Sequence, residues 1–260
     1  MNIVEPITST ESLTDYIVDS IEHARAVEEP FYHLELDRVF PVEVYGRMLG
    51  AMPVTSDYRH MSGRSRGETN SAPTRVKIDL FPEYIRALPA EKRRVWNLVG
   101  RALCSRPVTA AFLRRLAPAI ERRFGAGLRA ADFYPVPILT RDIPGYSIAP
   151  HPDTHWKGIT VQLYLPRDES ITHIGTIFHG EGPDGALARG PQMKFAPNTG
   201  YAFAVDKNTW HSADPVGPEV DTRDSILLTY FVDQGALRML RNRGKRIGNF
   251  ILNEVRQVTG

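Results

Sequence analysis

The sequence predicts an α+β fold in which a helical first half packs on an antiparallel β core. Before about residue 130 apolar side chains recur at the spacing of one helix face, as in Val95, Leu98, Val99 and Ala102. After that point short runs with a period of two alternate with Gly/Pro turns, which is typical of strands. A length of 260 residues suits one domain of this kind, so we expect a single domain over 1–260.

The helical layer is expected to cover about residues 1–130. Ser12 or Thr14 is suited to cap the first helix, because a hydroxyl can accept a hydrogen bond from the first turn. Pro41 fits the first turn of a later, short helix. The expected elements are a helix to about Val27, a strand over Phe31–Val39, a helix to about Gly50, a polar surface loop over Met52–Pro73, and helices over about Pro82–Leu103 and Pro107–Phe124.

The β core is expected over about residues 130–235, followed by a covering helix over about 235–260. One face of the Ile159–Leu165 stretch is apolar and the other carries Thr160, Gln162 and Tyr164, so one face should meet a core and the other something polar. Several strands at near-regular intervals favour a closed sandwich or barrel. The expected strands are Phe133–Leu139, Gly158–Leu165, Gly175–Phe178, Gly200–Val205 and Ser225–Val232.

Composition excludes several classes of protein. No apolar run approaches the roughly 18 residues of a membrane helix, so no membrane span is expected. The N-terminus lacks the basic start and apolar core of a signal peptide, and the single cysteine, Cys104, fits a reducing compartment; we therefore expect a cytoplasmic protein. A formal net charge of +2 is too small to indicate nucleic acid as a partner.

His151-Pro152-Asp153 is the strongest candidate for a metal site. Ligands at i and i+2 share one face of a strand, and the flanking prolines Pro150 and Pro152 disfavour a helix. That weakens the alternative in which His151 and His155 bind zinc from one face of a helix. His211 follows a later β run and can supply a third ligand. Two imidazoles and one carboxylate are typical of iron(II) sites with open coordination positions.

Arg223 lies 12 residues after His211 and opens a predicted strand. Arg223 and Ser225 would share one face of that strand. A guanidinium with a hydroxyl two residues on is suited to hold a carboxylate through a forked contact. The alternative is an ordinary ion pair of Arg223 with Asp221 or Asp224.

With these pieces together the chain resembles the Fe(II)/2-oxoglutarate-dependent dioxygenases, in particular bacterial members. The resemblance covers roughly residues 130–235 well and the rest loosely. The matching residues are Pro144-Gly145-x-x-Ile148-x-x-His151-x-Asp153, Gly175-Thr176-x-Phe178, His211-Ser212 and Arg223-x-Ser225, together with the N-terminal phrase Pro30-Phe31-Tyr32-His33-Leu34-x-Leu36-Asp37.

The resemblance implies a double-stranded β-helix, or jelly roll, with the metal inside one open end. It implies His151, Asp153 and His211 as Fe(II) ligands. Arg223, with Ser225, would bind the distal carboxylate of 2-oxoglutarate. The implied reaction uses O2 and converts 2-oxoglutarate to succinate and CO2 while a C–H bond of a small-molecule substrate is hydroxylated, with ascorbate as a possible reductant.

The chain departs from the family where some relatives carry a Tyr or Asn that touches 2-oxoglutarate. Here that stretch reads Thr140-Arg141-Asp142. Thr140 could replace the missing contact, and Gln162 and Tyr164 are alternatives on the next strand. Arg141, Trp156 and Lys157 are candidates for substrate binding. The Arg and Lys content of the surrounding loops points to an anionic metabolite, a sugar acid or a carrier-bound group.

Two other functions remain open from the sequence. One is a non-catalytic, cupin-like jelly roll that binds a metal or small molecule; the other is an iron enzyme that uses oxygen without 2-oxoglutarate. The pair Arg223 and Ser225 favours the dioxygenase, because a simple metal-binding barrel has no need of a carboxylate clamp. A homodimer through the helical layer is also open, since no sequence feature establishes or excludes it.

Overall fold

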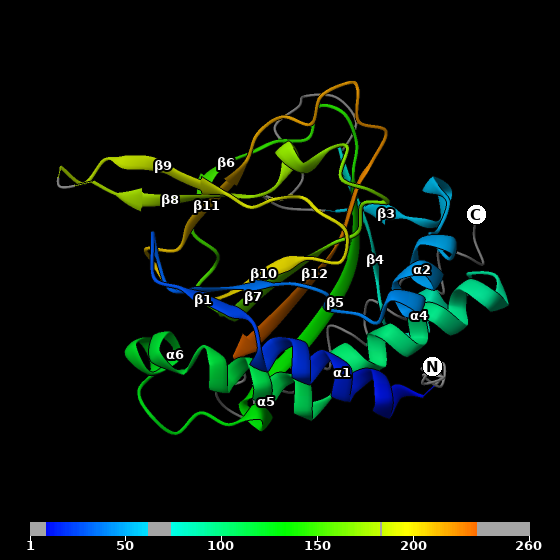
Figure 1. The fold of residues 1–260 in the computed structure, drawn as a ribbon, viewed down its shortest axis with the longest axis horizontal. Helices are drawn as coiled ribbons and strands as arrows, with labels where there is room; N and C mark the ends of the chain where they lie inside the picture. Colours follow the sequence, from blue (N-terminus) through cyan, green and yellow to red (C-terminus); the bar gives the residue numbers. More distant parts are fainter. Residues whose placement is uncertain (1–8, 62–73, 183, 233–260) are drawn as a thin grey trace, which may run out of the picture.

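The computed structural model describes residues 9–61, 74–182 and 184–232. Helices cover one face of a large antiparallel sheet, and a smaller sheet lies over the opposite face (Figure 1). The predicted α+β class is therefore confirmed, although the two sheets do not close into a barrel. The expected C-terminal helix over about 235–260 and residues 62–73 of the expected polar loop lie outside the described residues.

The helices lie in the first half of the chain, as expected. They are α1 (Thr10–Glu22), α2 (Val42–Gly50), α3 (Pro82–Ile85), α4 (Ala90–Leu103), α5 (Arg106–Arg115) and α6 (Ala117–Phe124), with short 3-10 turns η1 (Thr55–Asp57), η3 (Ala130–Asp132) and η4 (Thr172–Ile174). No helix in the described ranges has both the length and the apolarity that crossing a membrane requires.

The bounds of α1 differ from the prediction at both ends. Ser9, rather than Ser12 or Thr14, is the N-cap, and its hydroxyl accepts the backbone N–H of Ser12 at 3.1 Å. The helix ends at Glu22, five residues before the predicted end at Val27, because the chain from Arg25 to Val27 pairs with the next strand.

Each of the two long helices predicted between residues 82 and 124 is split in two. Pro89 is the N-cap of α4, and Pro118 lies in the first turn of α6. Proline lacks the N–H that would continue a preceding helix and disfavours helical backbone at the residue before it. The apolar spacing therefore predicts correctly that both stretches are helical, while the prolines determine where each stretch is divided into two helices.

The large sheet has the order β1-β2-β10-β7-β12-β5-β4-β3, and the small sheet has the order β6-β11-β8-β9. All pairings are antiparallel. The strands are β1 (Arg25–Val27), β2 (His33–Leu36), β3 (Arg59–His60), β4 (Arg75–Asp79), β5 (Phe133–Asp142), β6 (Ile148–His151), β7 (Lys157–Tyr164), β8 (Ile177–Glu181), β9 (Leu187–Gln192), β10 (Gly200–Ala204), β11 (Trp210–Ala213) and β12 (Arg223–Val232). Every predicted strand has a counterpart. β1, β3, β4, β9 and β11 were not predicted, and β6 was expected only as extended chain at His151.

The two faces of the large sheet lie in different environments, as the alternation of apolar and polar residues in Ile159–Leu165 predicted. Its outer face packs under the helices, where Leu139, Val161 and Leu228 join buried side chains such as Trp96 and Phe112. Its inner face and the small sheet enclose a second, aromatic cluster that contains Tyr146, Tyr164, Phe178, Phe195, Tyr201 and Phe203. The inner face is therefore the one that can carry a site between the two sheets.

Gly175 provides a test of the close approach between the chain just before β8 and the chain just after β9. A Cβ at this position would overlap the carbonyl oxygen of Met193, which is backbone and cannot swing away. We expect Gly175→Ala to lower the free energy of unfolding by about 1–3 kcal/mol, measured by urea denaturation.

Gly46 is the matched control, because it is exposed in the middle of α2 and a Cβ there meets nothing within 4 Å. Gly46→Ala should raise the free energy of unfolding by up to about 1 kcal/mol through helix propensity. Equal effects of the two variants would contradict the close approach at Gly175.

Candidate metal centre and adjoining cavity

The three predicted metal ligands meet. One ligand atom from each of His151, Asp153 and His211 lies within 4.8 Å of the others. His151 ends β6 and pairs directly with His211 on β11, so the register of the small sheet brings the two imidazoles to a centroid distance of 4.5 Å. Asp153 follows in the loop before β7. His155 is not part of this group among the described residues, so the zinc alternative gains no support.

The two histidines are held in the same way. Nδ1 of His151 donates to the carbonyl of Ala149 at 2.9 Å, and Nδ1 of His211 donates to the carbonyl of Thr209 at 3.0 Å. A carbonyl can only accept, so a proton lies on Nδ1, and in the neutral imidazole Nε2 then carries the lone pair that a metal needs. Such outer contacts orient metal-binding histidines.

Asp153 is held as a carboxylate by two side chains of β7. Lys157 Nζ donates to Oδ1 and Thr160 Oγ1 donates to Oδ2, both at 2.5 Å. Burial alone would raise the pKa of Asp153, but the charges of Lys157 and His211 and these two hydrogen bonds outweigh it and hold the pKa at about 2. The group is therefore ionised at neutral pH, as a metal ligand must be.

Arg123 connects the helical layer to the loop that follows Asp153. Its guanidinium, from α6, donates to the carbonyls of His155 at 2.5 Å and Lys157 at 2.8 Å, and also to the carbonyl of Val205. The loop that carries the carboxylate ligand is thus tied by its backbone to a helix on the far side of the large sheet.

The three ligands line a cavity of about 50 Å³ between the two sheets. The other lining residues come from both sheets and from the turn after β5: Arg75, Tyr146, Ile148, Lys157, Thr160, Gln162, Thr176, Tyr201, Ser212, Ala213, Arg223 and Leu227. Of these, Lys157, Gln162 and Arg223 were predicted as binding residues. Thr160 was expected only on the polar face of its strand, and Ile148, Thr176 and Ser212 were quoted only as parts of motifs. Arg75, Tyr146, Tyr201, Ala213 and Leu227 were missed.

Arg223 is fully enclosed in this wall, with 1% of its surface exposed. Nε donates to the carbonyl of Ile174 and Nη1 to Oδ2 of Asp142, both at 2.7 Å. Nη2 is buried and has no hydrogen-bond partner within the described parts of the chain. The partner Asp142 differs from both alternatives considered from the sequence, Asp221 and Asp224.

Asp142 also binds a second arginine. Arg75, on the neighbouring strand β4, donates to Asp142 through Nε at 2.5 Å and Nη2 at 2.7 Å. Asp142 is completely buried and both arginines are below 10% exposed. Two guanidinium groups sharing one carboxylate leave one excess positive charge in this wall of the cavity.

Tyr146 adds a second unpartnered donor to the same cavity. Gly145, with φ of 89°, makes the turn after β5 that places Tyr146 inside, completely buried. The Arg75 guanidinium lies 4.0 Å from the centre of its ring. Burial raises the pKa of Tyr146 to about 12, so the hydroxyl keeps its proton, and Oη has no hydrogen-bond partner among the described residues.

The four other residues expected to bind the co-substrate are hydrogen-bonded at or beside the cavity. Ser225 Oγ lies 2.9 Å from Thr140 Oγ1 and accepts from Gln162 Nε2 at 2.9 Å. Tyr164 donates to Thr176 Oγ1 at 3.1 Å, and the Thr176 backbone N–H donates back to Tyr164 Oη at 3.0 Å. Of these, Gln162 and Thr176 line the cavity itself.

Arg141 lies on the outer face of the large sheet, away from the cavity. Successive residues of a strand face opposite ways, so Asp142 points inward and Arg141 outward. Arg141 binds Asp224 at 2.8 Å and stacks over Tyr58. Trp156 is 48% exposed in the loop after Asp153 and is not a lining residue. Both stay predictions as substrate contacts.

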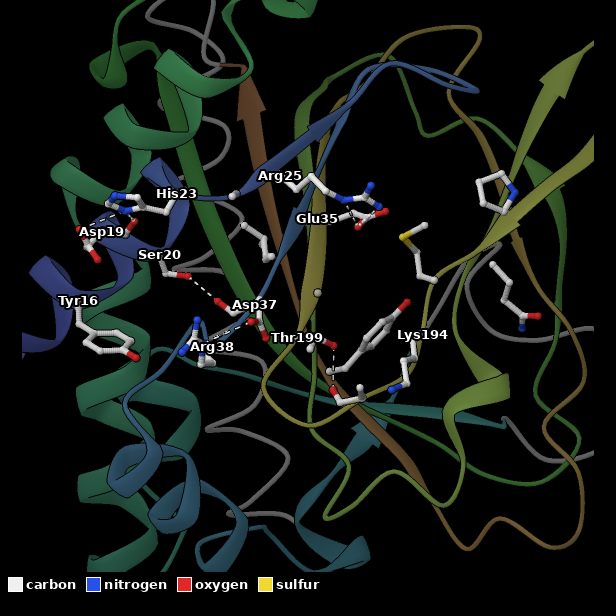
Figure 2. A pocket seen from close by; sticks show the side chains of 18 residues that line it. Tyr16, Asp19, Ser20, His23, Arg25, Glu35, Asp37, Arg38, Lys194 and Thr199 are labelled. Carbon is white, nitrogen blue, oxygen red and sulfur yellow. Dashed lines mark hydrogen bonds and ion pairs between the residues drawn. The ribbon is translucent and has the colours of Figure 1, made fainter.

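A larger hollow lies elsewhere. About 920 Å³ opens between α1, β2 and the chain after β9, and Figure 2 shows its charged side chains. These side chains pair among themselves or with neighbours, as in Arg25 with Glu35 and His23 with Asp19. Among the described residues they form no group of three or more potential metal ligands. Charge pairing already satisfies this surface, so the smaller cavity is the candidate site.

Comparison with known proteins gives a fold match but no sequence match. No protein-family model matches the sequence, and no curated protein matches it significantly. A prolyl hydroxylase from Trichoplax adhaerens, solved in complex with a hypoxia inducible factor oxygen degradation domain peptide fragment, aligns with a TM-score of 0.50 and 10% identity over 86% of this chain and 91% of that chain. The fold is the jelly roll of that enzyme.

Two further solved structures align at lower scores. A prolyl-4-hydroxylase from Pseudomonas putida gives a TM-score of 0.47 and 12% identity over 85% of this chain and 99% of that chain. The epimerase SnoN from nogalamycin biosynthesis, in complex with Fe3+, alpha ketoglutarate and nogalamycin RO, gives 0.47 and 11% over 85% and 84%. At such identities the likeness concerns the fold alone.

The donor set fits a divalent transition metal. Two imidazoles present their lone pairs, one carboxylate is ionised, and each ligand is oriented by its own hydrogen bonds. Three ligands on one side leave coordination positions open toward the cavity, which is the arrangement of non-haem iron(II) sites.

The enclosure of His211 predicts a pH dependence in the metal-free protein. Burial lowers the pKa of His211 to about 4, below its ordinary value of 6.5. Between these values the unfolded chain binds more protons than the folded one, so stability rises with pH. We expect the free energy of unfolding, measured by urea denaturation without metal, to fall as pH is lowered from 6.5 to 4.5.

His211→Gln should reduce this slope, while His173→Gln, at an exposed position, should keep it. Some slope should remain, because burial also lowers the pKa of His33 and of His179. The lowered pKa of Asp153 acts below this window. Identical slopes for the two variants would contradict a neutral, buried His211.

Proposed function

We propose that this protein is an Fe(II)/2-oxoglutarate-dependent dioxygenase. It hydroxylates a C–H bond of a small, anionic or carrier-bound substrate and converts 2-oxoglutarate to succinate and CO2. The observation that carries the proposal is a pair of buried donors without partners among the described residues, Arg223 Nη2 and Tyr146 Oη, in the cavity that the three metal ligands also line.

Buried polar groups normally find partners, because leaving one unsatisfied costs about 1–3 kcal/mol. Two donors that line the same cavity suit the oxygens of one carboxylate, which accepts several hydrogen bonds. A jelly roll that only bound a metal would need neither donor. This favours the dioxygenase over the non-catalytic alternative.

The charges of this wall agree with a carboxylate ligand. Arg75 and Arg223 carry two positive charges and Asp142 carries one negative charge, so the distal carboxylate of 2-oxoglutarate would bring the wall to neutrality. Ser225, predicted as a direct contact, would instead support this wall from the next register position, through Thr140 and Gln162.

Each part of the cavity then has a task. Bound iron(II) supplies the oxygen activation that no side chain here can provide. His151, His211 and Asp153 hold the metal, while Thr160 keeps one carboxylate oxygen of Asp153 in place. Arg223 and Tyr146 orient the co-substrate from its far end.

The carboxylate ligand also bears on the outcome of the reaction. By the resemblance described above, related halogenases give up this carboxylate to make room for halide. Asp153 is present, ionised and fixed by Lys157 and Thr160. We therefore propose hydroxylation as the outcome. A cytoplasmic location, a homodimer through the helical layer and the use of ascorbate stay predictions of the sequence.

The proposal predicts iron-dependent release of succinate from 2-oxoglutarate by the purified protein, with ascorbate present and without added substrate. His211→Ala should remove this turnover, because the metal loses a ligand. Arg223→Gln should raise the 2-oxoglutarate concentration for half-maximal turnover at least about tenfold, as expected for a lost hydrogen bond between charged groups.

Arg129→Gln is the control for the arginine variant, because Arg129 is exposed and lies outside the cavity. Absence of both succinate formation and iron-dependent 2-oxoglutarate binding in the wild-type protein would sink the proposal. If oxygen is consumed but Arg223→Gln changes nothing, the protein is instead an iron enzyme that works without 2-oxoglutarate.

Tyr146→Phe separates co-substrate binding from stability. The variant keeps the ring against Arg75 and removes only a hydroxyl without a described partner, so the free energy of unfolding should stay equal or rise by up to about 1 kcal/mol. Affinity for 2-oxoglutarate, measured by calorimetry on the Co(II)-loaded protein, should fall about tenfold.

Tyr58→Phe is the matched control, since Tyr58 Oη is also buried without a partner among the described residues but lies beside Arg141 on the outer face. It should leave 2-oxoglutarate affinity unchanged. Equal affinities for wild type and Tyr146→Phe would remove Tyr146 from the co-substrate site.

A further inference from the structure

The positive and negative charges of the side chains around the metal cavity do not sum to zero. Arg75, Lys157 and Arg223 line it as cations. The carboxylates of Asp142 and Asp153 are the anions that these three cations contact in the described parts of the chain. Three cations face two anions, so this set of side chains carries one excess positive charge.

Loading the site proposed above does not remove the excess. A divalent metal brings two positive charges and 2-oxoglutarate brings two negative charges, so the net charge of the set stays at +1. An uncompensated charge in a site shielded from water is costly, and proteins normally pair it. The loaded cavity therefore still favours one more negative charge.

Lys157 is the cation whose anionic contact, Asp153, would be shared with a bound metal. The two arginines share Asp142 and would take up the distal carboxylate of the co-substrate. Lys157 has only Asp153 as its anionic contact among the described residues, at 2.5 Å, and a bound metal would draw on that same carboxylate. The Lys157 side chain is 19% exposed, so water compensates it only in part.

The backbone of Lys157 is fixed, which keeps its ammonium at the cavity. Its N–H donates to the carbonyl of Thr154 at 3.0 Å, and its own carbonyl accepts from Arg123 at 2.8 Å. It is the first residue of β7, on the same strand as Thr160 and Gln162, which also line the cavity. The ammonium group thus lies next to the metal position.

We propose that Lys157 recognises a negatively charged group of the substrate, such as a carboxylate or phosphate, close to the C–H bond that is oxidised. This inference rests on the proposed function and names its substrate class. Lys157 would release part of its contact with Asp153 to the metal and donate to the substrate anion. Substrates with a neutral group at that position would leave the excess charge unpaired and bind weakly.

The test uses the full-length protein loaded with Co(II), which binds in place of iron without turnover, and saturated with 2-oxoglutarate. Benzoate and benzamide are the probes, because they match in shape and differ in charge. Binding is followed by calorimetry and by the visible spectrum of Co(II). Wild type should bind benzoate at least about tenfold more tightly than benzamide, the size expected for one hydrogen bond between charged groups.

Lys157→Gln should weaken benzoate binding at least about tenfold and abolish the preference for the anion, because glutamine can still donate to Asp153 but carries no charge. Lys157→Arg keeps the charge and should keep the preference, which covers the case in which glutamine disturbs Asp153. Lys194→Gln, at an exposed lysine outside the cavity, should behave as wild type.

The proposal is overturned if Lys157→Gln binds benzoate as tightly as wild type, if benzamide binds as well as benzoate, or if wild type binds neither probe. The same titrations are made without 2-oxoglutarate. Failure of the Co(II) protein to bind 2-oxoglutarate counts against the proposed function, whereas the comparison of Lys157→Gln with wild type judges Lys157 in either condition.

Discussion

The carboxylate of Asp142 is the group on which the candidate site depends most. It is completely buried and binds both Arg75 and Arg223, so each charge makes the burial of the others tolerable. Removing it would leave two enclosed cations without an anion, a change that typically costs several kcal/mol. The same contact, with the carbonyl of Ile174, turns the Arg223 guanidinium so that Nη2 remains available to a ligand.

The strands around Asp142 serve two environments at once. On the outer face β5, β7 and β12 contribute apolar side chains to the core under the helices. On the inner face β7 and β12 line the cavity, and β5 supplies Asp142 to Arg223. Register is therefore strongly constrained, since a shift of one residue would exchange the two faces. The pairing of β12 with β5 along ten residues, from Arg223 opposite Asp142 to Val232 opposite Phe133, provides that constraint.

A site residue could be predicted from the sequence only where the pattern that indicates it lies within a few neighbouring residues. The metal ligands His151 and Asp153 could be predicted because they form one short local motif with adjacent prolines. The expected strand holds only as far as His151, and Asp153 lies in the loop that follows it. Arg75 could not, because β4 follows a polar stretch and meets Asp142 only through sheet pairing. Tyr146 has no periodic signal, since a turn places it. The alternation of β5 would have separated inward Asp142 from outward Arg141 had the strand been extended by three residues.

The two histidines differ from the aspartate in what holds them. Each imidazole is hydrogen-bonded to the backbone carbonyl two residues earlier in the sequence. The pairing of β6 with β11 sets the distance between the two imidazoles. They form a preorganised chelating pair whose geometry is encoded in backbone pairing. Within the described parts of the chain, the carboxylate oxygens of Asp153 accept hydrogen bonds from two side chains of β7, Lys157 and Thr160. The residue at position 153 can therefore be substituted, in evolution or by design, without changing the backbone pairing that sets the two histidines.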